Sequence, residues 1–271
     1  MTVLQSFRTA LRIVTETPVL VAFALAFGLI GALNSASGPT GAVGSLLQLL
    51  AVPALIGAFY TVADGARPGS DTDLRATTAA QRYYVSLFGA TLLAGLVVVV
   101  VAMVVGGSVL GYIGFDRFNA VLNGSASLTL VELGALGVAG VTMVAVIYVF
   151  TFFDTAVVLD GKTAGGSLSR SVDFVFGNLR HVVGYAVVAT VATSVVDLPV
   201  LWLVSLDGAT TVAGAVTAFQ APMPAVDIAV VAVGSTVTTL VGRTYKVCFY
   251  RACTDETPGS DPEAADDEWS V

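Results

Sequence analysis

Few residues in this chain of 271 have side chains that could do chemistry, and three acids stand out by their positions. Glu132, Asp197 and Asp227 each fall near one end of a long apolar run. Ionisable groups in membrane-spanning segments are typical of ion or substrate paths, so the three acids form a candidate cation site. The competing interpretation keeps them apart, with Asp227 capping a helix and Glu132 at the level of the lipid headgroups.

Asp154 and Arg243 lie near the opposite ends of two of these runs, where an ion pair between them would fix helix packing. His181 is the only histidine, and Cys248 and Cys253 are the only cysteines. Cys and His alone therefore cannot provide the four ligands of a structural zinc site. The chain also contains neither GxSxG nor HExxH. We therefore expect no catalytic site, no metal and no cofactor.

The composition is that of a membrane protein. Hydrophobic residues make up 56% of the chain, charged residues only 11%, and the mean hydropathy is +0.87. Soluble domains carry about 25% charged residues, so much of this surface must face lipid instead of water. We expect the lipid bilayer as the main partner, other membrane or cytoplasmic proteins as further candidates, and no nucleic acid.

The acids are concentrated at the C-terminal end, where seven of the 19 lie in the last 17 residues. So many charges with so little apolar material predict a disordered cytoplasmic tail over 255–271, after a membrane domain over 1–254. Ten of the twelve bases are Arg. Scarce Lys, an acidic tail and small apolar side chains together resemble the proteins of salt-loving archaea.

The apolar runs predict an all-α polytopic fold with six transmembrane helices. The first run has a signal peptide as its alternative, but the long amphipathic segment before it, interrupted by Glu16, favours a spanning helix. The sixth helix should continue beyond its span through Tyr250. The predicted spans are about 18–33, 44–63, 84–110, 128–153, 181–204 and 226–242.

A repeated plan groups these spans into three hairpins, each preceded by a cytoplasmic amphipathic helix at the membrane interface. Asp64-Gly65 follows the second span and Asp160-Gly161 the fourth, 96 residues later, and a polar helix follows each pair. Within the first span, three small residues four apart would allow a neighbouring backbone to approach closely. They are Ala24, Gly28 and Ala32.

The bases orient the chain. Eleven of the twelve fall on one side of the predicted spans, and Arg117 alone falls on the other. The positive-inside rule then places both termini in the cytoplasm of a multi-pass protein of the cell membrane. The region 111–127 becomes an external loop, and it contains the chain's only glycosylation sequon, at Asn123.

The segment 150–185, between the fourth and fifth spans, forms an elbow of an extended approach, an amphipathic helix and a turn. Ser167 is expected to cap the helix, and Arg170 to reach lipid phosphates or helix-terminal carbonyls. Gly177-Asn178 is expected to turn the backbone into the bilayer. The residues that define the elbow are Ser167, Leu168, Arg170, Ser171, Gly177 and Asn178.

In the stretches 157–161, 167–171 and 177–178 the chain resembles a broad group of six-helix membrane domains. The group includes the membrane domain of some glycerophosphodiester phosphodiesterases and uncharacterised archaeal and bacterial membrane proteins. Gly166 and Val172 depart from the group's pattern, which often has Glu and Trp there, whereas Tyr245–Arg251 is similar to its closing segment. The resemblance implies no catalytic site, because the phosphodiesterase chemistry belongs to a separate soluble domain.

The hypothesis that fits these patterns is a non-catalytic membrane scaffold or regulatory protein. A small-solute or ion transporter or channel is the alternative, and it would require a hydrated cavity through the middle of the spans. An intramembrane enzyme would instead require clustered polar side chains.

Overall fold

The computed structural model describes residues 3–36, 38–70, 75–123, 125–205 and 225–255, and these ranges form ten helices and no strand. Within them, five helical stretches are long and apolar enough to cross a membrane, and the bent pair α1–α2 counts as a sixth if taken as one span. The chain is therefore all-helical, and its apolar helices fit a lipid environment. The predicted tail lies outside the described residues, apart from Asp255.

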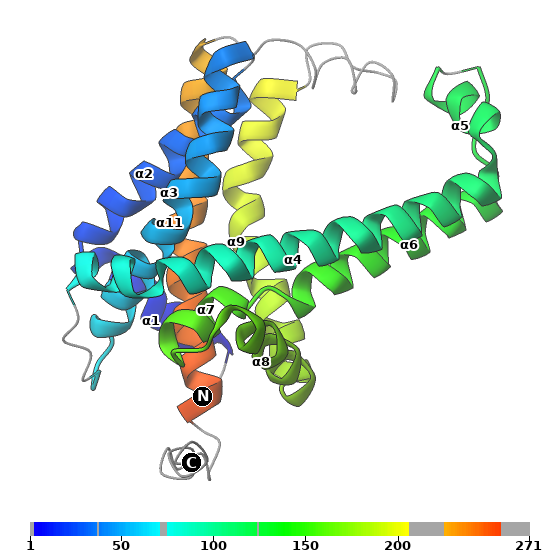
Figure 1. Ribbon diagram of the computed structural model, residues 1–271. Coiled ribbons are helices and arrows are strands. Elements are labelled where there is room, and N and C mark those ends of the chain that lie inside the picture. The colour runs from blue at the N-terminus through cyan, green and yellow to red at the C-terminus, as the bar shows by residue number, and fades with distance from the viewer. Residues whose placement is uncertain (1–2, 37, 71–74, 124, 206–224, 256–271) are drawn as a thin grey trace.

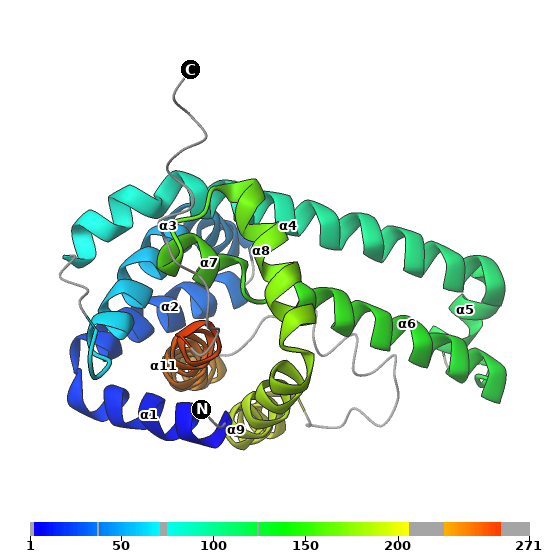
Figure 2. The ribbon, with the colours of Figure 1, turned by 90° about the horizontal axis from the view of Figure 1, so that it is seen from below.

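Helix α11 (Ala225–Asp255) stands at the centre of a bundle. Helices α1 (Val3–Glu16), α2 (Val19–Ser35) and α9 (Leu179–Ser205) pack against it, and α3 (Gly38–Gly65) packs beside α2. Figure 2 shows these neighbours around α11 from below. The continuation of the sixth helix past its predicted span is confirmed, because α11 is unbroken to Asp255.

The small residues of α2 form its contact with α11. Ala24 and Ala32 are buried, and a Cβ added to Gly28 would lie 2.6 Å from the carbonyl oxygen of Ala232 and closer still to the hydroxyl of Thr236. Only glycine therefore allows the two backbones to approach this closely. The spacing read from the sequence is thus a true helix–helix contact.

The chain bends sharply between α1 and α2. The two helices meet at Pro18 with an angle of 96° between their axes, and Pro18, which has no N–H to donate, stands at the start of α2. Ser6, Ala10 and Ile13 form the buried face of α1, while Leu4 and Leu11 are exposed. This is the amphipathic helix predicted before the first span.

The second hairpin differs from the prediction. Helix α4 (Ala76–Ile113) is continuous, so the polar helix expected before the third span is its first part. It ends at Gly114, whose φ of 84° favours glycine. The region predicted as an external loop contains α5 (Phe115–Leu122), and α6 (Leu130–Val149) then runs back along α4. Figure 1 shows this α4–α6 hairpin projecting sideways from the bundle, with α5 at its tip.

The helix of the predicted fourth span ends four residues earlier than expected, although the stretch Leu130–Leu159 as a whole is long and apolar enough to cross a membrane. Helix α6 ends at Val149, and a turn leads into the short helix α7 (Phe153–Leu159). Ser171, further along the chain, stabilises this turn, because its hydroxyl accepts the Phe152 N–H, which then does not continue the helix. Helix α8 (Ala164–Gly177) follows and leads into α9. Helices α1, α7 and α8 all lie at one end of the bundle, which we call the lower end (Figure 1).

Candidate functional site: a charged ring around α11

The lower half of α11 carries four polar side chains at helical spacing, Arg243, Lys246, Tyr250 and Arg251. Each of them reaches an acid on another element. We call this set the charged ring, and its members are Asp64, Arg67, Asp154, Asp160, Arg170, Arg243, Lys246, Tyr250 and Arg251. The ring consists of three junctions, one at each aspartate.

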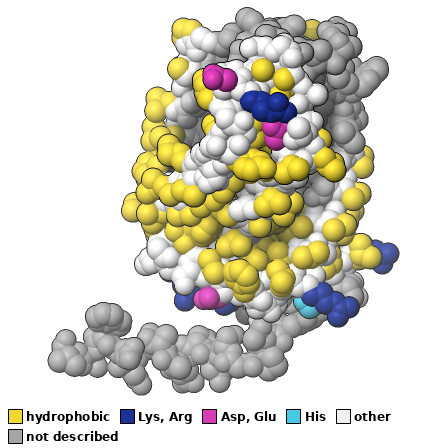
Figure 3. Space-filling model, turned by 90° about the vertical axis from the view of Figure 1, so that its right-hand side faces the viewer, with side chains coloured by type: hydrophobic (Ala, Val, Ile, Leu, Met, Phe, Trp, Pro, Cys, Tyr) yellow, Lys and Arg dark blue, Asp and Glu magenta, His cyan; other side chains and the backbone are white. Residues whose placement is uncertain are grey.

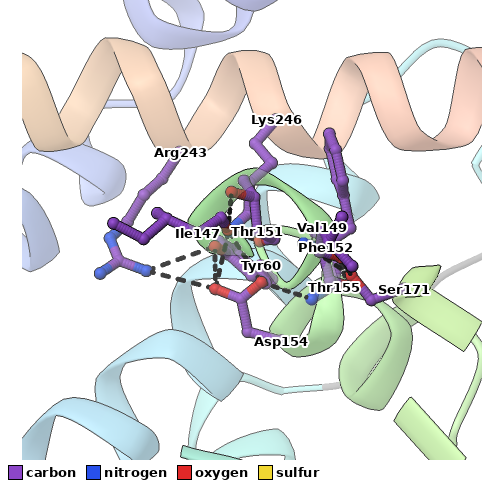
Figure 4. Close-up of polar contacts among 10 residues, drawn as sticks. All are labelled: Tyr60, Ile147, Val149, Thr151, Phe152, Asp154, Thr155, Ser171, Arg243 and Lys246. Atoms are coloured by element: carbon purple, nitrogen blue, oxygen red, sulfur yellow. Dashed lines mark hydrogen bonds and ion pairs between the residues drawn. The ribbon is translucent and has the colours of Figure 1, made fainter. Parts of the chain in front are cut away.

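Asp154 of α7 forms the first junction (Figure 4), and this residue is only 5% exposed. Lys246 Nζ lies 2.7 Å from one carboxylate oxygen, and the Tyr60 hydroxyl donates to the other across 2.7 Å. Arg243 Nη1 lies 3.8 Å from that second oxygen and donates to the Tyr60 hydroxyl at 3.3 Å. The backbone N–H of Thr155 is the third hydrogen-bond donor to Asp154, after Lys246 and Tyr60. The pair of Asp154 and Arg243 expected from the sequence is confirmed.

This junction contains more positive than negative charge, since Lys246 and Arg243 share one carboxylate. Lys246 also donates to the carbonyl oxygen of Thr151 at 2.8 Å, at the turn between α6 and α7. The Arg243 guanidinium lies 4.5 Å from the centre of the Phe27 ring. A carbonyl and an aromatic face thus supply the additional electron density that two buried cations need.

The second junction joins α11 to the end of α3. Arg251 binds both oxygens of Asp64, at 3.1 and 2.9 Å, in the bidentate geometry that makes such pairs strong. Arg67, three residues after Asp64, lies 3.5 Å from it and donates to Asp255 at 3.1 Å. Asp255 is the last residue of α11, so this junction fastens the C-terminal end of α11 to the end of α3 and to the turn that follows it.

The third junction joins α11 to the elbow. The Tyr250 hydroxyl donates to Asp160 at 2.6 Å, and Arg170 Nε donates to the same oxygen at 3.1 Å. Asp64 and Asp160 are the two residues that the repeated plan placed 96 positions apart. They bind consecutive residues of α11, Arg251 and Tyr250. The repeat therefore has a structural meaning, because each copy supplies one acid to the same central helix.

Aromatic rings pack between the junctions. Phe152 lies 4.8 Å from Phe174 and 5.3 Å from Tyr185, measured between ring centres, and Phe174 lies 4.6 Å from Tyr250. These side chains are all buried. The low-dielectric surroundings strengthen each ion pair but also raise the desolvation cost of its charges.

The elbow residues act differently from the prediction. Thr163, not Ser167, caps α8 by accepting the Gly166 N–H, whereas Ser167 is buried and donates to the carbonyl of Ala164. The prediction failed because α8 begins one turn earlier than the sequence pattern indicates. Leu168 is only partly buried, and the buried face is formed by Ser167, Ser171, Phe174 and Val175.

Two further elbow residues hold the backbone. The Ser171 hydroxyl donates to the carbonyl of Val149 at 2.7 Å and accepts the Phe152 N–H, which ties α8 to the end of α6. Asn178 ends α8, since its side-chain amide donates to the Phe174 carbonyl at 3.1 Å. Gly177 does not use the left-handed region; in the elbow, Gly161 does, with a φ of 64°.

The outer acids lie on separate elements. Glu132 forms a capping box with Thr129 at the start of α6 and accepts two hydrogen bonds from Arg117 of α5. Glu132 therefore joins α5 to α6 at the tip of the hairpin. The side chains of Asp197 and Asp227 lie outside the described residues, and the candidate cation site stays a prediction. Asn123 is exposed at the end of α5, and the glycosylation hypothesis also stays a prediction.

Among the described residues, no group of three His, Cys, Asp or Glu side chains could hold a metal ion. The charged ring instead pairs each aspartate with cations or hydroxyls, and this arrangement stabilises contacts between elements. A family model for a domain of unknown function, DUF7847, matches residues 1–253. The chain belongs to this family. Comparisons with curated proteins and with solved structures found no match.

For this DUF7847 chain, the sequence pattern predicts the pair of Asp154 and Arg243 but not the roles of Lys246 and Arg251 in the ring, nor that of Tyr60, which also binds Asp154. A signal was present, because 243, 246 and 250 recur at spacings of three and four on one face of a helix that also has aromatic residues. Lys246 and Arg251 are also two of the eleven bases on one side of the predicted spans, a role that requires no partner. Their partners could not be identified from spacing alone.

Proposed function

We propose that this DUF7847 protein is a non-catalytic multi-pass protein of the cell membrane that acts as a scaffold or regulator, with the α4–α6 hairpin as its partner-binding surface. The proposal includes the orientation indicated by the bases, with both termini in the cytoplasm. It also retains the likeness to salt-loving archaeal proteins and to the non-catalytic membrane domain of phosphodiesterases.

The observation that carries the proposal is the position of the hairpin outside the bundle (Figures 1 and 2). Its outer part packs helix against helix, and large apolar side chains are exposed on it, among them Met103 at 70%, Val138 at 68% and Val141 at 72%. Figure 3, seen from the side toward which the hairpin projects, shows a broad hydrophobic surface with charged side chains grouped near its upper end and along its lower edge.

Lipid alone can solvate such a hydrophobic surface, so what favours a protein partner is the shape of the surface. A groove of about 360 Å³ runs between α4 and α6 and is lined almost entirely by apolar side chains. Gly106 and Gly140 lie in it, and a Cβ on either would meet nothing within 4 Å. Small residues between larger apolar ones are what membrane helices use to approach each other closely, so the groove fits a transmembrane helix of another protein.

The charged ring supports a structural role for the rest of the chain. Asp64, Asp154 and Asp160 each engage at least one cation and hold α3, α7 and the elbow to α11. An acid or base that works in catalysis needs a substrate within hydrogen-bond reach. Here, neighbouring side chains take those positions.

The transporter remains a second candidate because of one observation, the surplus cation at Asp154. Ionisable groups inside a membrane bundle are functional by default, and Lys246 is buried there. A transporter role would require Asp154→Asn to abolish solute flux in proteoliposomes while the protein stays folded. The scaffold proposal instead expects the wild-type protein to show no solute flux, and Asp154→Asn to unfold the protein.

The scaffold proposal is tested by photo-crosslinking in the native membrane. A photoactivatable residue replaces Met103 on the hairpin or, as the control, Val195 on α9, which is equally exposed at 70%. We expect Met103 to crosslink to protein and Val195 to lipid, because the groove of about 360 Å³ lies on the hairpin and not on α9. Crosslinking of both positions to lipid alone would overturn the proposal.

A further inference from the structure

A second cavity lies at the lower end of the bundle, away from the hairpin. It has a volume of about 320 Å³, which is in the range of small-ligand pockets. Three elements enclose it: Ser6 and Thr9 of α1, Arg67 in the turn after α3, and Cys248 and Asp255 of α11. We call it the Arg67 pocket. Its lining mixes polar and apolar groups, unlike the hairpin groove.

Arg67 is the residue that gives this pocket its chemistry. Its side chain is only 18% exposed, and its Nη1 atom is buried and makes no hydrogen bond. The nearest acid to Nη1 is Asp64 at 3.5 Å, but Arg251 already holds both oxygens of that carboxylate. A guanidinium presents five N–H donors in a planar fork, and this one is only partly used.

Asp255 is a weak partner for Arg67. Its carboxylate accepts one hydrogen bond from Nη2 at 3.1 Å, and its side chain is 56% exposed. Ion pairs with an exposed partner contribute little, because water competes for both charges. An anion with more oxygens could displace Asp255 from Nη2 of Arg67 and at the same time accept hydrogen bonds from the neighbouring hydroxyls.

The other lining groups fit a phosphate. Ser6 and Thr9 add two hydroxyl groups on the same helix, and hydroxyls donate well to phosphate oxygens. Helix α1 is amphipathic, with Leu4 60% exposed and Leu11 41% exposed, so it suits the membrane interface, where lipid phosphates are found. The pocket thus offers one underused guanidinium and two hydroxyls beside a helix whose exposed apolar side chains suit the membrane interface.

We propose that the Arg67 pocket binds the phosphate of an anionic phospholipid headgroup, and that Asp255 competes with this headgroup for Arg67. The Arg67 guanidinium binds the phosphate through Nη2, the nitrogen that Asp255 otherwise engages, and Ser6 and Thr9 donate their hydroxyl hydrogens. When the site is empty, Asp255 occupies the guanidinium. This site is independent of the hairpin surface and of whatever partner that surface binds.

Cys248 provides a readout inside the pocket. In a Cys253→Ser background it is the only thiol, so its rate of alkylation in the detergent-solubilised full chain reports on access to the pocket. The probes are short-chain phosphatidylglycerol, short-chain phosphatidylcholine and inorganic phosphate at equal concentrations. We expect phosphatidylglycerol to slow alkylation and the other two to have little effect. Equal protection by inorganic phosphate would overturn the lipid assignment, and protection by none of the three would overturn the site.

Variants test the role of Arg67 as the group that binds the phosphate and the role of Asp255 as its competitor. Arg67→Gln should weaken phosphatidylglycerol binding by about tenfold or more, since it removes charge-assisted hydrogen bonds. Arg67→Lys should keep part of the affinity, and Arg170→Gln, in the ring but outside the pocket, should keep all of it. Asp255→Asn should strengthen binding by up to about fivefold, because an exposed competing ion pair is lost. Unchanged affinity in both Arg67→Gln and Asp255→Asn would contradict the proposal.

Native mass spectrometry supplies a second measurement that does not depend on Cys248 reactivity. Wild-type protein extracted from the membrane should retain phosphatidylglycerol, and Arg67→Gln should retain less of it than Arg170→Gln does. Equal retention by both variants would overturn the assignment to Arg67.

Discussion

Lys246 and Asp154, separated by 92 residues in the chain, lie 2.7 Å apart between α11 and α7. Both side chains are largely buried, at 12% and 7% exposure. The contact joins the central helix to α7, the short helix that follows α6 at the end of the predicted fourth span. It therefore fixes where the elbow sits against the bundle.

Asp154→Asn should destabilise the protein more than Lys246→Met does. Asp154 receives hydrogen bonds from Tyr60, Lys246 and the Thr155 N–H, so its loss leaves two cations without their shared carboxylate. Removing one partner of a buried pair costs about 3–5 kcal/mol. Lys246→Met leaves Asp154 with Tyr60 and Arg243. Thermal unfolding of both variants in detergent checks the order, and equal midpoints would contradict it.

Tyr250→Phe should destabilise the protein, whereas Tyr245→Phe should not. Both tyrosines are buried on α11, but the Tyr250 hydroxyl donates to Asp160 at 2.6 Å and the Tyr245 hydroxyl lies 3.5 Å from the carbonyl of Val3. A hydrogen bond to a charged group contributes about 1.5–3 kcal/mol. The midpoint of Tyr250→Phe should fall, and hydrogen exchange should rise in α8. A larger fall for Tyr245→Phe would show that the third junction is not a stabilising contact.

Gly28→Ala should loosen the contact of α2 with α11, whereas Gly31→Ala should be tolerated. A Cβ at 28 would collide with backbone of α11, but a Cβ at 31 would come no closer than 3.9 Å to Ser235. Overpacking of this kind costs about 1–3 kcal/mol. The measurement is the thermal midpoint of each variant. Equal midpoints would mean that the two backbones do not approach as closely as described.

The sequence predicted which segments are apolar helices, because length and hydropathy decide that property. Hydropathy did not predict which helices pack together, since membrane helices are apolar on all faces and show little periodicity. The spacing of the small residues at 24, 28 and 32 predicts a close helix contact, but the sequence does not indicate that α11 is the helix they contact. The projecting α4–α6 hairpin was hidden for the same reason.

The charged ring was partly predictable. Asp154 and Arg243 were paired because both lie near one boundary of the predicted spans. Lys246 was missed, because a lysine beside a span also fits a simple role as an orienting base. Ser167 was placed at the wrong helix position, because several Ser, Thr and Gly residues precede α8 and the backbone turn selects Thr163. These outcomes depend on tertiary contacts that spacing does not encode.

The proposed function places the lower end of the bundle in the cytoplasm. Single cysteines in a background without Cys248 and Cys253 test this orientation, one at Gly165 in α8 and one at Ser125 beyond α5. Both positions are exposed, and a side chain at 165 would meet nothing within 4 Å.

The deciding measurement is labelling of these two variants in intact cells with a membrane-impermeant thiol reagent. The cysteine at 125 should be labelled in intact cells, and the cysteine at 165 only after permeabilisation, because eleven of the twelve bases mark the lower side as cytoplasmic. Labelling of position 165 in intact cells, with position 125 protected, would contradict the orientation.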